Sequence, residues 1–350
     1  MNAHRLGGAL FALALTLPAT APAAGFQDVL DTPAMTSELA ARGLINGLAL
    51  AGQRVVGVGQ RGHVVYSDDA GKSWRQAKVP VSSDLVAVSF PTARAGWAVG
   101  HDGVVLASND AGASWTKQLD GRAVGTMMVE YYKAQSGDEA AKWVSEAERF
   151  AAQGAENPFL DVWFADEQNG FVVGAFNLIL RTTDGGKHWE PWLDRTENPQ
   201  ALHLYAIRGA EGEVFATGEQ GLVLRLDARA GVFRALQTPY QGTYFGVAPA
   251  KDAVIVFGLR GNAFRSTDSG RTWHKIDTGV QEGLTAAATV GDQGVILASQ
   301  AGRLLVSRDG GEHFSPLKLD RAVPASAVQP LGTDAVVVAG ARGVRVHTLR

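Results

Sequence analysis

One short motif recurs along this chain of 350 residues and constrains its fold more than any other feature. Five octapeptides are near-copies of one another: SDDAGKSW (67–74), SNDAGASW (108–115), TTDGGKHW (182–189), STDSGRTW (266–273) and SRDGGEHF (307–314). The closing aromatics of the first pair and of the last pair are 41 residues apart, and a degenerate copy, LDARAGVF (226–233), lies in the longest gap. A motif with a period of about 40 residues indicates a stack of equal units, so the repeat decides the fold class.

A second landmark precedes the octapeptides: a glycine or another small residue, two loop residues, and then a second glycine or an asparagine. Its instances are Gly59/Gly62, Gly100/Gly103, Gly174/Asn177, Gly218/Gly221, Gly258/Gly261, Ser299/Gly302 and Gly340/Gly343. Apolar runs such as 96–100 and 104–107 flank this landmark, and short runs rich in valine, isoleucine and aromatics between glycine turns predict strands. Four strands in about 40 residues is the period of a propeller blade. The sequence therefore predicts an all-β, seven-bladed β-propeller.

The seventh unit (323–350) contains only three predicted strands before the chain stops. An open ring would leave unpaired strand edges, which closure of the ring removes. We therefore expect residues 26–30 to supply the fourth strand and to close the ring as a velcro, which pairs the two ends of the chain.

The N-terminal segment is typical of a secretory signal. A short start with one positive charge at Arg5 precedes an apolar run over 6–17, and Ala21-Pro22-Ala23 forms an A-x-A cleavage pattern. The run is too short to span a membrane. We expect a signal peptide over 1–24, one propeller domain over 25–350, and a soluble periplasmic protein. The sequence contains no cysteine, which excludes disulfides and a lipidated N-terminal cysteine.

The formal charge of −3 gives no reason to expect a nucleic-acid partner. The sequence also shows no metal-ligand cluster, nucleophile elbow or phosphate-binding loop. We therefore predict a monomer with no cofactor and no metal.

The octapeptide S-x-D-x-G-x-[ST]-W resembles the Asp-box, also called the BNR repeat. Its aspartate can accept backbone N–H groups within a turn, its glycine permits a positive φ, and its closing aromatic can pack between neighbouring sheets. We interpret the motif as structural, although a carboxylate-rich metal or sugar site is an alternative. The structural set is Asp69, Asp110, Asp184, Asp268 and Asp309, with Trp74, Trp115, Trp189, Trp273 and Phe314.

Function is expected on the face of the propeller opposite the Asp-boxes. Turns between the third and fourth strands of each blade share one face, whereas the second-to-third-strand turns and the links between blades share the other. The landmark turns on that second face carry Arg61, His101, Arg260, Arg303 and Arg342. Arginine suits bidentate recognition of carboxylates and phosphates, so we predict a partner-binding rim. The alternative is that these side chains are simply solvated.

One insertion, at about 121–158, interrupts the repeat on the same face. Ser136 and Glu139 match a capping box, and Trp143, Ala147 and Phe150 recur at helical spacing before Gly154. Residues 127–132 suggest a preceding turn or short helix. The predicted helix can pack on its own propeller, cover the mouth as a lid, or dock a partner.

The link that follows the third unit, at about 191–205, is long and rich in polar and aromatic residues. Loops on a rigid scaffold commonly carry specificity. The predicted partner-binding set is therefore completed by Trp143, Asp194, Arg195, His203 and Tyr205.

Sialidases are propellers with Asp-boxes, and a glycan-processing enzyme or a glycan-binding lectin is the alternative function. Their Arg-Ile-Pro motif is absent here, and the seven near-equal units differ from the usual six blades. Tyr205, Tyr240 or Tyr244 could be nominated as a nucleophile, but nothing in the sequence pairs them with a glutamate.

The closer resemblance is to the photosystem II stability and assembly factor family. It is carried by Gly-[WF]-x-x-Gly before the turn and an Asp-box after it, as in 96–100 with 108–115 and 170–174 with 182–189. The resemblance implies a non-enzymatic helper that binds a membrane-protein subunit during assembly. This chain departs from the family in its helical insertion and in a last blade without an Asp-box. Relatives with such insertions in non-photosynthetic bacteria suggest an accessory protein of an envelope complex, such as a resistance-nodulation-division exporter.

Overall fold

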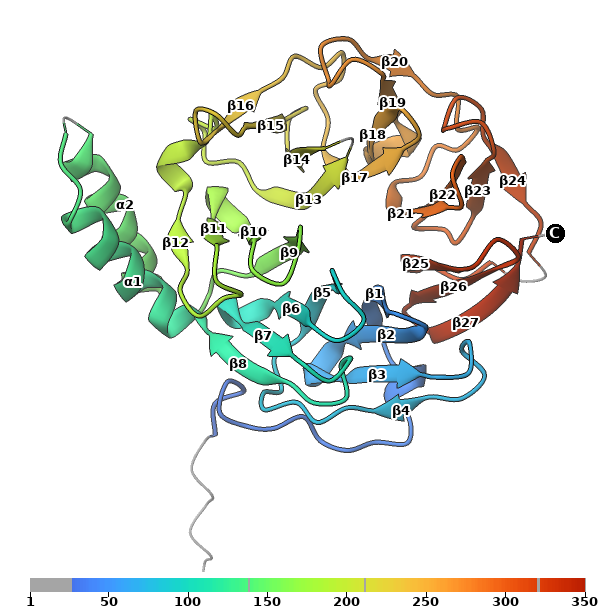
Figure 1. Ribbon diagram of the computed structural model, residues 1–350, viewed down its shortest axis with the longest axis horizontal. Helices are drawn as coiled ribbons and strands as arrows, with labels where there is room; N and C mark the ends of the chain where they lie inside the picture. The colour runs from blue at the N-terminus through green and yellow to red at the C-terminus, as the bar shows by residue number, and fades with distance from the viewer. Residues whose placement is uncertain (1–26, 138, 211, 320–321, 350) are drawn as a thin grey trace, which may run out of the picture.

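The computed structural model describes residues 27–137, 139–210, 212–319 and 322–349. Seven antiparallel sheets stand around a central axis as a seven-bladed β-propeller (Figure 1). Each sheet follows chain order, from an inner strand at the axis to an outer strand at the perimeter. The predicted fold class is confirmed, and the repeats correspond to blades. Among the described residues, no helix is long and apolar enough to cross a membrane.

The first four blades have four strands each. Their bounds are β1 (Ile45–Ala51), β2 (Arg54–Gly59), β3 (Val64–Ser67) and β4 (Arg75–Gln76); β5 (Leu85–Ser89), β6 (Gly96–Gly100), β7 (Val105–Ser108) and β8 (Thr116–Leu119); β9 (Phe159–Phe164), β10 (Gly170–Gly174), β11 (Ile179–Thr182) and β12 (Glu190–Pro191); β13 (Leu204–Ala210), β14 (Glu213–Gly218), β15 (Val223–Asp227) and β16 (Val232–Ala235).

Blades 5 and 6 also have four strands, and blade 7 has three. Their bounds are β17 (Tyr244–Ala250), β18 (Ala253–Gly258), β19 (Ala263–Ser266) and β20 (His274–Lys275); β21 (Leu284–Val290), β22 (Gly294–Ser299), β23 (Leu304–Ser307) and β24 (Ser315–Leu317); β25 (Ala325–Leu331), β26 (Ala335–Gly340) and β27 (Gly343–Thr348). Single turns of 3-10 helix lie at η1 (Ala40–Arg42), η2 (Gln60–Gly62), η3 (His101–Gly103), η4 (Ala175–Asn177), η5 (Leu193–Arg195) and η6 (Leu259–Gly261).

The Asp-boxes form the turns between the third and fourth strands, and their hydrogen bonds explain the recurring residue types. In blade 1, Asp69 accepts hydrogen bonds from the Ser73 backbone N–H (2.8 Å) and hydroxyl (2.6 Å), while the Ser67 hydroxyl accepts from the Gly71 N–H (2.8 Å). Gly71 has φ +84°, a conformation that favours glycine. The Trp74 indole N–H donates to the Gly71 carbonyl (3.1 Å), which ties the aromatic to its own turn.

The velcro prediction for residues 26–30 needs correction. Residue 26 lies outside the described residues, and residues 27–30 form a turn in which Asp28 accepts a hydrogen bond from the Leu30 N–H (2.9 Å). Leu30 is buried in the cluster between blades 1 and 2, and its carbonyl accepts a hydrogen bond from Lys117 (2.9 Å). The aspartate-stabilised turn therefore competes successfully with strand pairing.

The first and last blades pack face to face where the ring closes. Ile45 of β1 shares a buried cluster with Ala327 of β25, Ala339 of β26 and Ala40 of η1. Among the described residues, closure of the ring thus rests on apolar packing and not on a shared sheet.

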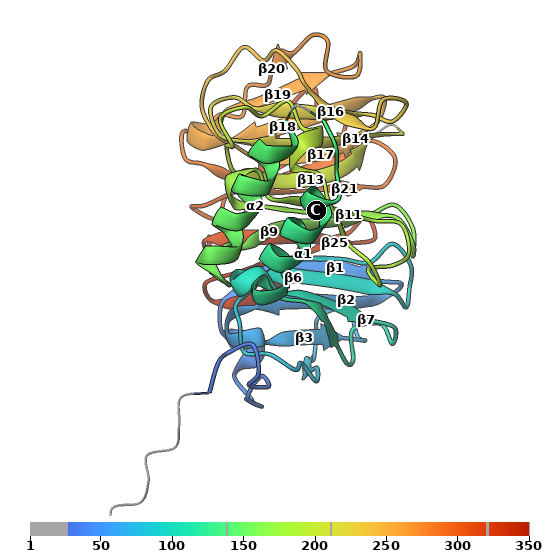
Figure 2. The ribbon, with the colours of Figure 1, turned by 90° about the vertical axis from the view of Figure 1, so that its left-hand side faces the viewer.

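The insertion forms two helices, α1 (Gly121–Lys133) and α2 (Ala140–Gln153). They lie outside the ring beside β12, and the turned view shows them against the flank of the propeller (Figures 1 and 2). Their buried side chains share one cluster with Leu178 and Leu193 of blade 3. The structure thus has the insertion packed on its own propeller, away from the channel mouth.

The predicted capping box is not formed. Helix α2 begins at Ala140 with Glu139 as its N-cap, and no side chain caps it, whereas Gly154 ends it with φ +66° as expected. Helix α1 is longer than the short element suggested, because Asp120 caps it by accepting a hydrogen bond from the Arg122 N–H (3.1 Å). Burial would raise the pKa of Asp120, but hydrogen bonds from Arg122 and Lys117 hold it at about 2.

Candidate functional site

The two faces of the propeller are chemically different. The box face carries the Asp-box turns, and the turn face carries the second-to-third-strand turns together with the links between blades. On the turn face, Arg61, Asp102, Phe176, Gln220 and Arg260 occupy the same turn position in blades 1 to 5, and all have φ between +52° and +57°. A left-handed backbone at a non-glycine residue is uncommon, so the fold holds these five side chains in one unusual geometry.

A β-bulge near the start of each inner strand aims one side chain at the axis of the propeller. The register skips one residue in every blade, and a bulge of this kind re-aims the skipped side chain. All seven skipped residues line a central cavity of about 230 Å³. This bulge ring consists of Asn46, Val86, Leu160, Tyr205, Phe245, Thr285 and Ser326.

The bulge ring is asymmetric. Its two aromatic members, Tyr205 and Phe245, are neighbours in blades 4 and 5, whereas blades 6, 7 and 1 contribute Thr285, Ser326 and Asn46. The channel mouth therefore has a bulky aromatic side and a small, polar side.

An aromatic track runs from the rim of the turn face to this mouth. Phe176 of η4, which is 41% exposed, contacts the His203 ring at 4.6 Å, and His203 lies 6.3 Å from the Tyr205 ring. Tyr205 then meets Phe245 edge to face at 5.8 Å. These four residues, Phe176, His203, Tyr205 and Phe245, are called the aromatic track below.

Two further groups fix the electrostatics of the track. The Arg149 guanidinium of α2 lies over the Phe176 ring at 5.7 Å, which connects the insertion to the rim. Glu219 accepts a hydrogen bond from the His203 backbone N–H (2.9 Å) and lies 3.2 Å from its ring nitrogen. Burial, with a contribution from the Glu219 carboxylate, raises the pKa of Tyr205, so this tyrosine is a neutral contact group at ordinary pH.

Four of the five predicted cations, all of them arginines, lie on four consecutive blades of the turn face. We call Arg260, Arg303, Arg342 and Arg61, from blades 5, 6, 7 and 1, the arginine arc. All four are exposed. Arg303 pairs with Glu282 at 3.0 Å, whereas the other three have no ion pair within the described part of the chain. Arg342 differs from Arg61 and Arg260, because Gly340 and Gly343 pair directly and leave it in a two-residue turn.

Other predicted site residues lie apart from this mouth. His101 is exposed on η3, beside the start of the insertion. Asp194 accepts a hydrogen bond from the Tyr132 hydroxyl (2.9 Å), and Trp143 stacks on the Tyr132 ring at 5.9 Å. These contacts join the insertion to the link after blade 3.

Arg195 also belongs to this internal contact. It donates hydrogen bonds to Glu190 and to the Tyr131 hydroxyl, both at 2.9 Å, and Tyr131 in turn donates to Glu190 at 2.7 Å. Burial, followed by the Glu190 contact, raises the pKa of Tyr131 to about 12. These three side chains tie α1 to the link after blade 3 on the flank of the molecule.

Tyr240 and Tyr244 were also nominated as nucleophiles, and their surroundings indicate structural roles. Tyr244 is buried, and burial raises its pKa to about 12. The Tyr240 hydroxyl donates a hydrogen bond to the Leu259 carbonyl (3.2 Å).

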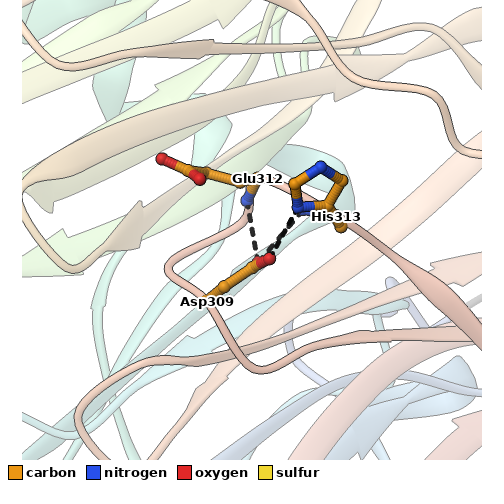
Figure 3. Close-up of side chains that lie close together, drawn as sticks. All are labelled: Asp309, Glu312 and His313. Carbon is orange, nitrogen blue, oxygen red and sulfur yellow. Dashed lines mark hydrogen bonds and ion pairs between the residues drawn. The ribbon is translucent and has the colours of Figure 1, made fainter.

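One group of possible metal ligands is explained by the Asp-box itself. Asp309, Glu312 and His313 lie together on the box face (Figure 3). His313 occupies the motif position that serine or threonine fills elsewhere, and its ring nitrogen contacts Asp309 at 2.8 Å. His188 repeats this contact with Asp184 at 2.6 Å. All three members are exposed, and their mutual contacts are those of the turn.

Sequence reasoning found His203 and Tyr205 but missed Phe176 and Phe245. Both omissions had a signal in the repeat. Phe176 fills the turn position of Arg61 and Arg260, and Phe245 follows Tyr244 as Tyr205 follows Leu204. An alignment of all seven units would have found these positions.

The fold and the repeats define a class of protein, the BNR-type β-propeller similar to photosystem II assembly factors. The family described as photosynthesis system II assembly factor YCF48 matches residues 140–232, from α2 to β16. This match confirms the resemblance seen in the sequence.

Particular relatives carry the same name. The chain is 26% identical over 183 residues to photosystem II assembly lipoprotein Ycf48 of a Synechococcus species, covering 50% of this chain and 53% of that protein. It is 29% identical over 161 residues to the protein of the same name from Prochlorococcus marinus, covering 44% and 46%. The chain thus spans about half the length of the curated relatives it matches. Both relatives are named as assembly proteins and not as enzymes.

Two solved structures share the fold. "YCF48 bound to D1 peptide" superposes with a TM-score of 0.64 at 17% identity, over 89% of this chain and 94% of that one. YCF48 from Cyanidioschyzon merolae gives 0.61 at 16% identity, over 87% and 95%. At this identity, the likeness shows the propeller fold alone.

Proposed function

We propose that this chain is a non-catalytic, periplasmic scaffold that binds an extended segment of a membrane-protein subunit during assembly of an envelope complex. The observation that carries the proposal is the asymmetric channel mouth, where the aromatic track ends at the bulge ring beside the arginine arc. The names of the relatives support an assembly role, and a solved structural neighbour described as bound to D1 peptide supports a peptide ligand.

The chemistry of the turn face suggests the kind of segment. Aromatic rings offer a large, rigid contact area, and exposed arginines recognise carboxylates. The bound segment is therefore expected to place an apolar or aromatic residue on Tyr205 and Phe245 and acidic groups toward Arg61 and Arg342. Acidic neighbours such as Asp84 and Glu282 limit the net positive charge of the face, so recognition depends on individual pairs and not on a general field.

The compartment and the partner class are the finer parts of the proposal. The signal pattern at 1–24 lies outside the described residues, but export agrees with the relatives being named lipoproteins. A resistance-nodulation-division exporter is the first candidate complex, as the resemblance implies. Sequencing of the N-terminus of the protein recovered from the periplasmic fraction checks export. A start near residue 24 supports it, and an intact residue 1 contradicts it.

In-cell crosslinking of a tagged chain, followed by mass spectrometry, tests partner binding. The variant Arg61→Glu with Arg342→Glu is expected to lose the captured membrane protein while the thermal midpoint stays nearly unchanged, because both side chains are exposed. Lys187→Glu with Arg229→Glu is the matched control, since it makes the same charge change in two exposed turns of the box face.

The outcomes separate the possible readings. Loss of capture in the turn-face variant alone supports the proposal. Equal loss in both variants, or an equal loss of folding, contradicts it. Recovery of the monomer alone would also contradict it, and turnover of a fluorogenic glycoside that depends on one tyrosine or glutamate would replace the scaffold with an enzyme.

A further inference from the structure

Within the part of the chain that the structure describes, the last blade ends in a strand edge that no fourth strand covers. In six sheets the third strand pairs with an outer fourth strand, whereas β27 is the outermost strand of blade 7 among the described residues. A strand edge presents unpaired N–H and C=O groups and is a template for pairing with another strand. Val346 near its middle is 42% exposed, and in the described ranges only Met35 and Leu39 are more exposed among the large apolar side chains.

The other blades show where a fourth strand would pair. The register of the second and third strands aligns Val344 with Val64, Ile179, Val223 and Ala263. In those four blades the carbonyl of the aligned residue accepts a backbone N–H from the outer chain at 2.8–3.0 Å; the donors are Ala77, Trp192, Leu236 and Ile276.

The backbone N–H and C=O groups of Val344 therefore point away from β26. Because neighbouring residues of a strand alternate in direction, Val346 and Thr348 do the same. Within the described ranges, no backbone donor from outside the β26–β27 pair reaches the Val344 carbonyl. One row of main-chain groups is thus placed for a further strand.

A groove of about 780 Å³ lies along this edge, between β27 and the first Asp-box turn. Its lining includes Gly71, Lys72, Val344, Arg345 and Val346. A Cβ built on Gly71 would lie 2.6 Å from a Val346 methyl, so the turn closely approaches the edge. The groove is comparable in volume with sites that hold ligands of drug or short-peptide size.

The charges at the groove favour an acidic occupant. Lys72 and Arg345 are exposed and line the groove. Neither of these two cations has an ion pair among the residues that the structure describes. The nearby Asp69 carboxylate is already engaged by Ser73 and Ser67.

We propose that the β27 edge is a second interaction surface, which binds an extended segment of a partner protein as the fourth strand of blade 7. The segment alternates small apolar residues, which cover Val346, with acidic residues, which lie on the Arg345 face of the strand. Main-chain hydrogen bonds supply affinity and the alternate side chains supply specificity, as in other cases of strand addition. This surface lies on the perimeter, away from the channel mouth, so it does not depend on the function proposed for that mouth.

The test uses the full-length mature protein and a defined probe, the capped hexapeptide Thr-Val-Glu-Val-Glu-Thr. Backbone hydrogen exchange is followed with and without the peptide at about 1 mM, the weak end of specific affinities. Exchange at Val344, Val346 and Thr348 is expected to slow, while the aligned residues of the complete blades stay unchanged. The matched peptide Thr-Val-Lys-Val-Lys-Thr should bind more weakly.

Two variants keep the proposal falsifiable. Val346→Pro removes an outward N–H without touching the β26 pairing, a position where an edge strand tolerates proline, and should weaken binding by about tenfold or more. Arg345→Glu keeps every backbone group and should reverse the preference between the two peptides. Arg229→Glu, an exposed turn residue of blade 4, is its charge-matched control and should change neither.

Each remaining outcome would overturn the proposal. No slowing with either peptide would show that the edge does not accept a strand. Slow exchange of these amides in the free protein would show that the chain covers its own edge. Slow exchange that depends on protein concentration and disappears in Val346→Pro would make a second copy the occupant.

Discussion

Replacing glycine by alanine usually stabilises a helix, but the close crossing of the two insertion helices predicts the opposite effect in α1. Gly121 and Gly125 lie one turn apart on α1. A Cβ built on Gly125 would lie 2.4 Å from the Ala151 Cα and 2.7 Å from its N, and one on Gly121 would lie 2.6 Å from the Ala155 Cα. Carbon atoms normally pack at about 3.5–4.0 Å, so Gly125→Ala must separate α1 from α2 by about 1 Å.

The expected energies decide the direction. A glycine-to-alanine change in a helix interior normally stabilises by about 0.5–1 kcal/mol, whereas overpacking a tight contact costs about 1–3 kcal/mol. We therefore expect Gly125→Ala to destabilise the helical pair by about 1–2 kcal/mol. Hydrogen exchange of the α1 and α2 amides, with urea unfolding beside it, measures this loss locally and globally.

The matched control compares two variants at one exposed position of α2, Ser145→Gly and Ser145→Ala. The alanine variant should be the more stable of the two, because no neighbouring backbone crowds this position. Gly125→Ala could instead stabilise the protein as much as alanine does relative to glycine at position 145. In that case the close backbone approach does not hold the insertion on blade 3, and the reasoning fails.

Two further predictions concern the Asp-boxes. Hydrogen bonding by the His188 backbone N–H and ring lowers the pKa of Asp184 to about 2, below its unfolded value of about 3.9, so its stabilising effect is present at neutral pH and fades as pH falls from about 4 towards 2. Urea midpoints at pH 7 and pH 3 should therefore differ less in Asp184→Asn than in the natural chain, and an unchanged difference would contradict the assignment. Trp115 is 5% exposed and its indole N–H donates to the Gly112 carbonyl, so Trp115→Ala should cost about 3–5 kcal/mol of unfolding free energy, whereas half-buried Phe314 should tolerate alanine better. Equal losses in a denaturant titration would show that burial does not set the cost.

Most of the fold could be predicted from the sequence repeat. The Asp-box needs a serine or threonine, an aspartate and a glycine because their side-chain and backbone hydrogen bonds close one turn, as at Ser67, Asp69 and Gly71. These contacts are local, so the motif predicts the turn, its period predicts the blades, and the glycine landmarks predict the opposite face.

Only part of the candidate site could be predicted from the sequence. His203 and Tyr205 were found because they lie in one polar, aromatic link, whereas Phe176 and Phe245 join them from other blades. Asp194 and Arg195 had the composition of a binding loop, yet they contact Tyr132 and Tyr131 of the insertion. A side chain suited to a partner is equally suited to a neighbouring segment, and only the packing of that segment distinguishes the two.

The sequence by itself determined the number of blades, the two kinds of turn and the face that each occupies, because hydrogen bonds over a few residues and a regular period fix all three. The tertiary structure decided how the ring closes, where the insertion lies and which side chains meet at the axis. Leu30 packs between blades 1 and 2, β27 is the outermost strand of blade 7 among the described residues, and the bulges turn Tyr205 and Phe245 toward each other. Those outcomes depend on competition among contacts far apart in the chain, which no local pattern specifies.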